Sequence, residues 1–548
     1  MKFEDYFSFE AIVGDLIRWR VKGKGTIDEN GRRDVEKVLP PRKAWSRAGA
    51  MARKGVDPEV VRKQAIWRTV MQHRRAGTLG ETEWGRRHTA LVEGVREAVF
   101  SGDVEFEKPR MIKIAKGYKD GVREFRDVAS FDRLADRVIL SRTTAYVRDV
   151  LEDVLGGCCY SFRRDPEMNH QLAIKNLQEW RERQAARPEF ASSQALPTMY
   201  VAECDIRRFF DHISHYIVRI CWDSMRFDPL ARNILEAYLS VYSSTEGSAY
   251  VHSGRVALIS EVYTNDGRRG LPQGGSFSTV LANLVLHSAD KAVKGLGWDE
   301  DSFYARYCDD VVIAHPDESI CRSMLESYMF TMEWLELPVH PVESFIYFPE
   351  GGKATDYYTI KSKGPFRWGE PKIGEANCAP WVSFLGSQVR YDGETRIRTE
   401  SIERHIRALG CETAAAVREI DKGNVGDVAV WFARFRNRLI AKGVGYVTAK
   451  VNDCHLCWAG AFMRVTPCAD TRMQMRRLDR VREGMLCKVW RMVMEACGNK
   501  HRRYKGRPFS YYGFLKKAVR PTNLRAMRYD GQANIAYRRR ITLAYSEL

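Results

Sequence analysis

The chain has 548 residues, more than one typical domain, and its 44% apolar content can build a sizeable core, which excludes a mainly disordered protein. Lysine and arginine outnumber the acids by 88 to 70, and the excess of 18 lies entirely in residues 401–548, where 30 basic residues face 12 acids. A basic block of this size favours nucleic acid as a partner, because neutralised phosphates release their counter-ions.

The cysteines and the apolar pattern favour a cytoplasmic protein. The 13 cysteines are scattered without the spacing of a disulfide framework. The first ten residues, MKFEDYFSFE, lack the apolar core of a signal peptide. Because no run of 18 apolar residues occurs, we expect no membrane span and no membrane partner.

Three regions follow one another along the chain. Residues 1–100 have the mixed charge and spacing of a helical N-terminal extension. Residues 101–395 combine short strands, glycine turns and apolar helices, which indicates an α+β catalytic domain. Residues 396–548 are basic and again helical. The clearest predicted helices span residues 60–73, 428–440 and 473–494.

Two segments of the middle region predict a strand and a helix that carry polar side chains. Tyr-Val-Ala-Glu-Cys-Asp-Ile-Arg-Arg-Phe-Phe-Asp, residues 200–211, predicts a strand that ends at Asp205 and then turns into a helix. Gly-Leu-Pro-Gln-Gly-Gly-Ser-Phe-Ser, residues 270–278, leads into a helix with apolar residues at helical spacing. Ser276 or Ser278 is expected to cap that helix.

A third segment, residues 303–314, predicts a β-hairpin with Asp309 and Asp310 at its tip. Alone, such a pair most often marks only a turn. Joined to Asp205, however, the carboxylates suit two Mg²⁺ ions, which stabilise the attacking and the leaving oxygen of a phosphoryl transfer. Repulsion between adjacent carboxylates also favours a bound cation. The sequence therefore predicts a site for divalent metal, with Mn²⁺ as an alternative ion.

The three segments together resemble reverse transcriptases, above all the bacterial branch related to group II intron proteins. The match rests on Asp-x-x-x-Phe-Phe-Asp from Asp205, Gly-x-Pro-Gln-Gly-x-x-x-Ser from Gly270 and Tyr-x-Asp-Asp from Tyr307. The resemblance covers residues 105–389. It implies a right-hand polymerase of the α+β class: fingers and a palm with an antiparallel sheet within residues 101–395, and a helical thumb after them.

The resemblance also implies roles for single residues. Asp205 and Asp309 would ligate both ions, with Asp310 as the third acid. Phe210 matches the steric gate that favours deoxynucleotides by excluding a ribose 2′-hydroxyl, and Gln273 matches the residue under the incoming sugar. The expected contacts to the dNTP phosphates are Arg163, Lys116 and Arg123, of which Arg163 offers a bidentate fork. The expected primer grip is Phe384, Leu385 and Gly386.

One position departs from this pattern. Intron-type relatives carry Glu-Lys-Thr after the catalytic hairpin, whereas this chain has Val342, Glu343 and Ser344. The general acid for pyrophosphate therefore stays unassigned, with Lys353 and His340 as open alternatives.

The basic tail has two features of its own. Cys454 and Cys457 could supply half a zinc site, but without a second pair at ligand spacing we favour free thiols. Basic and aromatic residues interleave, which suits nucleic-acid binding or packing of a thumb core. The tyrosines considered as protein primers are Tyr504, Tyr511, Tyr512, Tyr537 and Tyr545.

The leading hypothesis is an RNA-directed DNA polymerase that copies a noncoding RNA into cDNA, with dNTPs as substrates. The chain is similar to stand-alone bacterial reverse transcriptases of the abortive-infection and unknown-group classes, which implies antiphage defence. Protein-primed or template-independent DNA synthesis is a second hypothesis, and an intron maturase-type RNA-binding protein is a third. A homo-oligomer is left open.

Overall fold

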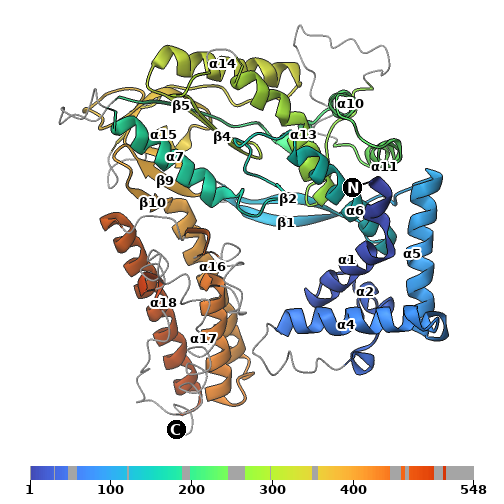
Figure 1. Ribbon diagram of the computed structural model, residues 1–548. Helices are drawn as coiled ribbons and strands as arrows, with labels where there is room; N and C mark the ends of the chain where they lie inside the picture. Colours follow the sequence, from blue (N-terminus) through green and yellow to red (C-terminus); the bar gives the residue numbers. More distant parts are fainter. Residues whose placement is uncertain are drawn as a thin grey trace. The chain divides into compact units, whose positions relative to one another are not determined.

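The computed structural model describes residues 2–29, 31–46, 58–119, 122–187, 198–244, 266–295, 298–348, 356–444, 458, 460–462, 468–498 and 510–513. The chain divides into two compact units. The first consists of Met1–Asn169 and Met199–Phe366, and the second of His170–Thr198 and Arg367–Leu548. Helices and strands are mixed in both units, so the α+β class is confirmed (Figure 1). Within the described residues, no helix is both long and apolar enough to cross a membrane.

The N-terminal region is helical, as predicted. Ser8 caps its first long helix by accepting a hydrogen bond from the backbone of Ala11, and Thr82 caps another by accepting one from Gly85. Their apolar faces join the main core of the first unit. The elements are η1 (Phe3–Phe7), α1 (Phe9–Val21), α2 (Asp34–Lys37), η2 (Arg42–Ala44), α4 (Pro58–Arg75), η3 (Leu79–Glu81) and α5 (Glu83–Ser101).

A long hairpin and a central sheet follow. β1 (Arg110–Lys119) and β2 (Val122–Ser130) pair antiparallel and are followed by α6 (Leu134–Glu152). The central sheet has the strand order β4-β5-β3-β6-β7. β5 lies between β4 and β3 and runs antiparallel to both, which confirms the predicted hairpin. Its strands are β3 (Tyr200–Cys204), β4 (Phe303–Tyr307), β5 (Asp310–His315), β6 (Lys363–Trp368) and β7 (Cys378–Ala379).

Helices pack on this sheet in the first unit. α14 packs against β3 and β5, and α13 packs against α14, α6 and α10 (Figure 1). Most residues of α13 are buried, because the helix has neighbours on several sides. The helices are α9 (Phe209–His212), α10 (His215–Asp223), α11 (Pro229–Ser240), α13 (Ser276–Val293), α14 (Glu318–Trp334) and α15 (Asp356–Thr359).

The predicted cap of α13 is wrong. Gly275 occupies the N-cap position, and no side chain caps the helix there. Ser276 is already the first helical residue, and the hydroxyl of Ser278 donates a hydrogen bond to the carbonyl of Pro272 at 2.6 Å. Ser278 is also bonded to the Tyr238 hydroxyl at 2.6 Å. These tertiary partners take the hydroxyl away from the helix end.

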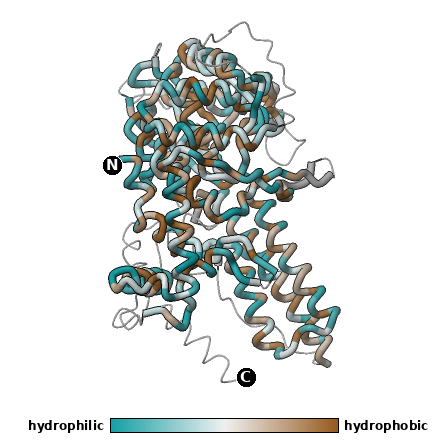
Figure 2. Tube along the Cα trace, turned by 90° about the vertical axis from the view of Figure 1, so that its right-hand side faces the viewer, coloured by the Kyte–Doolittle hydropathy of each residue, from teal (hydrophilic) through white to brown (hydrophobic). Residues whose placement is uncertain are grey.

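The second unit joins a small sheet to long helices. The sheet has the order β10-β9-β8, and β7 pairs with the end of β6 that belongs to this unit. α16 packs against α17 and α18, and polar and apolar stretches alternate along the long helices (Figure 2). Two of these helices confirm the predicted ones at 428–440 and 473–494. The elements are α7 (His170–Ala185), β8 (Trp381–Phe384), β9 (Ser387–Arg390), β10 (Thr395–Ile397), α16 (Thr399–Asp421), α17 (Val428–Val444), η5 (Gly460–Phe462) and α18 (Ala469–Ala496).

Candidate active site

Asp205 is the first residue after β3, as the sequence predicts, and its backbone is held on both sides. Its N–H donates to the Ser362 hydroxyl at 3.1 Å, and its carbonyl accepts from the backbone N–H of His340 at 2.9 Å. The residue is half-buried. These two bonds hold the Asp205 backbone in place where the chain turns after β3, and so they fix the point from which its carboxylate extends.

Asp309 and Asp310 lie at the turn between β4 and β5. Tyr307 pairs with Asp310, so Cys308 and Asp309 form a two-residue connection. Cys308 has a φ of 60°, in the left-handed region that two-residue hairpin turns require and that few residues other than glycine adopt. Such backbone strain often occurs at functional sites.

The strand register brings the three aspartates to one edge of the sheet. Cys204, the last residue of β3, pairs with Val311 of β5. Asp205 follows Cys204 and Asp310 precedes Val311, so these two aspartates face each other across the end of an antiparallel pair. Asp309 is next to them on the turn.

The charges of these aspartates affect one another. Burial and then the charges of Asp309, Asp205 and Glu203 raise the pKa of Asp310 to about 7. Many protein atoms surround the Asp310 carboxyl, yet the residue is exposed to solvent. Burial raises the pKa of Asp309, and the charge of Asp205 raises it further. Three carboxylates that repel one another offer the oxygen donors that Mg²⁺ prefers.

The carboxylate oxygens of the three aspartates are donors that suit a divalent ion, although in this structure the three side chains do not converge on one position. Among the residues that the structure describes, no group of three or more His, Cys, Asp or Glu side chains is close enough to hold a metal ion. Asp205 instead forms an ion pair with Lys361, whose Nζ lies 3.4 Å from Oδ2.

A buried polar network supports the turn from below. The fully buried Arg306 of β4 donates from Nε and Nη2 to the two oxygens of Asp290 at 2.7 and 2.6 Å. Its Nη1 donates to Asn283 at 3.1 Å and to the carbonyl of Cys308 at 3.3 Å. The Cys308 N–H donates to the Ser161 hydroxyl at 2.9 Å. We did not predict this network, although a charged residue within a buried strand indicates a buried partner.

Phe210 and Gln273 lie on neighbouring segments, as a nucleotide site would require. Phe210 is half-buried in α9, and its carbonyl accepts from the N–H of Leu271 at 2.7 Å. The side chain of Gln273 donates to Asp211 at 3.3 Å. The Gln273 carbonyl accepts from Ala129 of β2 at 2.8 Å, which ties this loop to the long hairpin.

Position 274 requires glycine, because a side chain there would collide with β2. The φ of Gly274 is 96°, and a Cβ atom there would lie 2.4 Å from Cγ1 of Val128. Contact with β2 is therefore possible only without a side chain at this position.

Arg163 uses its guanidinium within the protein. Its Nε donates to Glu152 at 3.0 Å, and Nη1 donates to the carbonyls of Gly156 and Cys159 at 2.8 and 3.0 Å. These bonds fix the loop that carries Ser161, so Arg163 supports the network below the aspartates. Its contact with a triphosphate stays a prediction.

Two further predicted phosphate contacts lie on the long hairpin. Lys116 is in β1 and Arg123 in β2, but their side chains lie outside the described residues. A third basic residue of the hairpin, Arg126, opposes the burial that raises the pKa of Asp309. The hairpin thus brings positive charge toward the aspartates.

The predicted primer grip forms a tight turn in the second unit. Phe384 is buried at the end of β8, and Leu385 and Gly386 connect it to β9 with φ angles of 52° and 80°. Two positive φ angles are typical of the type I′ hairpin turn. The carbonyl of Gly386 accepts from the N–H of Arg398, which fixes the start of α16.

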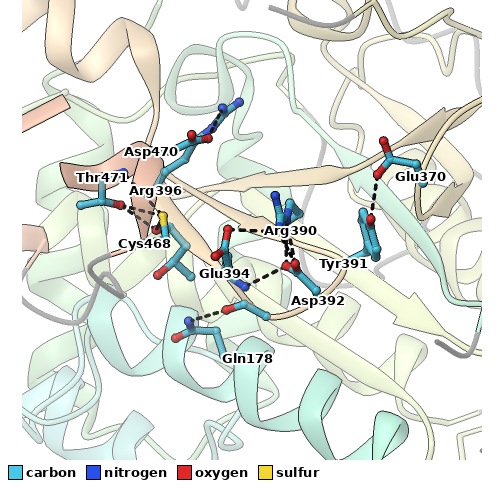
Figure 3. Close-up of polar contacts among 12 residues, drawn as sticks. Gln178, Glu370, Arg390, Tyr391, Asp392, Glu394, Arg396, Cys468, Asp470 and Thr471 are labelled. Carbon is cyan, nitrogen blue, oxygen red and sulfur yellow. Dashed lines mark hydrogen bonds and ion pairs between the residues drawn. The ribbon is translucent and has the colours of Figure 1, made fainter. Parts of the chain in front are cut away.

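The neighbouring β9–β10 hairpin is tied to the start of α18 (Figure 3). Arg396 pairs with Asp470 at 3.0 Å, and the Thr471 hydroxyl donates to the carbonyl of Thr395 at 2.8 Å. The β9–β10 hairpin, which follows the predicted primer grip, is thus anchored to a long helix of its own unit.

The tail and the alternative proton donors are described only in part. Tyr511 is buried, its hydroxyl is bonded to His405 Nε2 at 2.7 Å, and burial raises its pKa, all of which disfavour it as a primer. Tyr512 is half-buried beside Arg476. Burial lowers the pKa of His340, which disfavours the protonated imidazolium that a general acid needs. Outside the described residues lie Lys353, Cys454, Cys457, Tyr504, Tyr537 and Tyr545.

The buried network makes a prediction about stability. Arg306→Met leaves the Asp290 carboxylate buried and unpaired, so the free energy of unfolding should fall by roughly 3–5 kcal/mol. Adding Asp290→Asn to this variant should recover part of the loss, because it removes the unpaired charge. Urea denaturation measures both effects. Arg322→Met, which removes an exposed arginine of α14, is the control, and an equal loss in that variant would contradict the prediction.

Comparisons with known proteins address the identity of this site. Residues 162–353 match the family described as reverse transcriptase (RNA-dependent DNA polymerase). No curated protein matches the chain.

Similar solved structures are yeast telomerases. Apo telomerase from Candida tropicalis has a TM-score of 0.39 and 9% identity over 79% of this chain and 69% of that one. Telomerase from Candida albicans with a fragment of telomeric RNA has a TM-score of 0.35 and 9% identity over 84% and 77%. A C. tropicalis apo telomerase truncated from the C-terminal domain has a TM-score of 0.33 and 11% identity over 53% of this chain and 54% of that one, so the alignment spans about half of its length.

The matched segment contains Asp205, Gln273, Asp309 and Asp310. The match to the family described as reverse transcriptase (RNA-dependent DNA polymerase) thus covers about a third of the chain, and that third carries the predicted metal ligands.

Proposed function

We propose that the protein is an RNA-directed DNA polymerase that uses Asp205, Asp309 and Asp310 for two-metal nucleotidyl transfer. The observation that supports this most is the register of β3 and β5. It sets Asp205 opposite Asp310 at one sheet edge, inside the segment that matches the reverse transcriptase family.

The protein's own residues would divide the work. Asp205 and Asp309 would hold two Mg²⁺ ions, and Asp310 would add negative charge beside them. When bound, such ions stabilise the attacking 3′-oxygen and the leaving pyrophosphate. Arg306 and Ser161 keep the turn in place while the charges around it change.

A right-hand arrangement accounts for the remaining elements. The hairpin β1–β2 would serve as fingers, the central sheet as palm and the helices α16, α17 and α18 as thumb. The fingers assignment is supported by the bond from Ala129 of β2 to Gln273 and by the charge of Arg126 near Asp309. The basic charge of residues 401–548 supports contact of the thumb with a nucleic-acid backbone.

A noncoding RNA template and a role in antiphage defence are further parts of the proposal, and the sequence resemblance supports them. Sequencing the nucleic acid that copurifies with the protein, and the DNA that it makes from dNTPs, tests the RNA template. DNA complementary to a bound RNA supports templated synthesis. DNA made without a template would favour template-independent synthesis. DNA that mass spectrometry finds covalently bonded to the protein would favour protein-primed synthesis.

The metal ligands can be tested by removing two of them. Asp309→Ala together with Asp310→Ala should abolish dNTP incorporation on an RNA template with a DNA primer. The metal-free protein should unfold at the same or a higher temperature, because two repelling charges are gone. Asp153→Ala, which removes an exposed aspartate, is the control. Synthesis retained by the double variant would rule out this site.

The gate can be tested by opening it. In Phe210→Ala the missing ring should admit a 2′-hydroxyl, so the preference for dNTPs over rNTPs in kcat/KM should fall about 10- to 200-fold. Phe330→Ala, at an exposed phenylalanine of α14, should leave the preference unchanged. An unchanged preference in Phe210→Ala would show that this ring is only a core residue.

A further inference from the structure

Among the described residues, Lys361 is the lysine that forms an ion pair with one of the proposed metal ligands. Its Nζ lies 3.4 Å from Oδ2 of Asp205, and its side chain is 64% exposed while that of Asp205 is 26% exposed. Within the described part of the chain, Asp205, Asp309 and Asp310 have no other ion pair with a lysine or an arginine.

The backbone at Lys361 is fixed, although its side chain extends into solvent. The next residue, Ser362, is fully buried and accepts a hydrogen bond from the N–H of Asp205. The carbonyl of Ser362 accepts from the N–H of Glu343 at 3.2 Å, and Ser362 pairs with Val342 in a parallel bridge. Because the backbone is fixed and the side chain is exposed, the Lys361 ammonium can exchange one anionic partner for another without any movement of the backbone.

The next lysine shows the opposite arrangement. The Nζ of Lys363 lies 2.7 Å from Glu203, with side-chain exposures of 6% and 11%. Breaking that buried pair would leave an uncompensated charge, so it is permanent. The pair of Lys361 and Asp205 faces water, where an ion pair contributes at most about 1 kcal/mol, and it can therefore be exchanged.

We propose that Lys361 is a positioning residue that acts as an exchangeable counter-ion of the aspartate site. It pairs with Asp205 while no divalent ion is bound and yields the carboxylate when one binds. Its ammonium then turns to the triphosphate of the incoming nucleotide, the anion that the proposed reaction brings to this site. This inference rests on the proposed function, and it assigns to the short segment before β6 a positive charge that serves both the metal-free and the loaded state.

Binding of Mn²⁺ to the full-length protein without nucleotide tests the first half. Electron paramagnetic resonance of free Mn²⁺ should show roughly three- to tenfold tighter binding to Lys361→Met than to the wild type, since the competing charge is gone. Lys361→Arg should stay within about twofold of the wild type because it keeps that charge. Lys108→Met, which removes an exposed lysine of the same unit, should have no effect. Mn²⁺ affinity of Lys361→Met equal to or weaker than that of the wild type would overturn the proposal.

Titration calorimetry with dATP at saturating Mn²⁺ tests the second half. Lys361→Met should bind dATP several-fold more weakly than the wild type, and Lys361→Arg should restore most of the affinity. Equal affinity in all three would overturn the transfer to the triphosphate. Both measurements are independent of DNA synthesis. If Lys361→Met binds Mn²⁺ more tightly than the wild type, but the wild type makes no DNA, the result would support the role of Lys361 and contradict only the proposed polymerase function.

Discussion

The pairing of Arg306 with Asp290 is the interaction on which the rest of the site depends. A guanidinium with no exposure to water is tolerated only because Asp290 takes two of its N–H groups and Asn283 and Cys308 take others. Since Asp290 and Asn283 belong to α13 and Arg306 to β4, this one group joins the helix after Gln273 to the hairpin that carries Asp309. The spacing of the nucleotide segment and the aspartates is thereby set from inside the core.

The aspartates show how function opposes stability here. Burial, and then the charges of neighbouring carboxylates, raise the pKa of Asp310 and of Asp309, so the folded protein tolerates charges that repel one another. The buried acids near the aspartates are neutralised by ion pairs. Glu203 pairs with Lys363, and Asp290 pairs with Arg306. Fixed pairs thus lie in the interior, while the unbalanced charge is kept at the surface where ions and substrate arrive.

Local pattern explains which parts could be predicted from sequence. The strand before Asp205, the hairpin at Asp309 and the long helices follow from periodicity over neighbouring residues, and all are present. Contacts between distant segments could not be inferred. The hydroxyl of Ser278 is taken by Pro272 and Tyr238, so the helix is not capped as expected. Arg163 bonds to Glu152, and Lys361 reaches Asp205 from over a hundred residues away. Such pairings depend on the tertiary fold, which no short pattern encodes.

The interleaving of the two units has a consequence for modularity. The chain leaves the first unit at Asn169, returns at Met199 and leaves again after Phe366, and α7 lies in the excursion. The family match at 162–353 therefore runs through both units. No single cut separates them, because removing the segment after Phe366 would strip α7 of its partner β9. The segment after Phe366 can thus be gained, lost or exchanged in evolution only together with the internal helix α7.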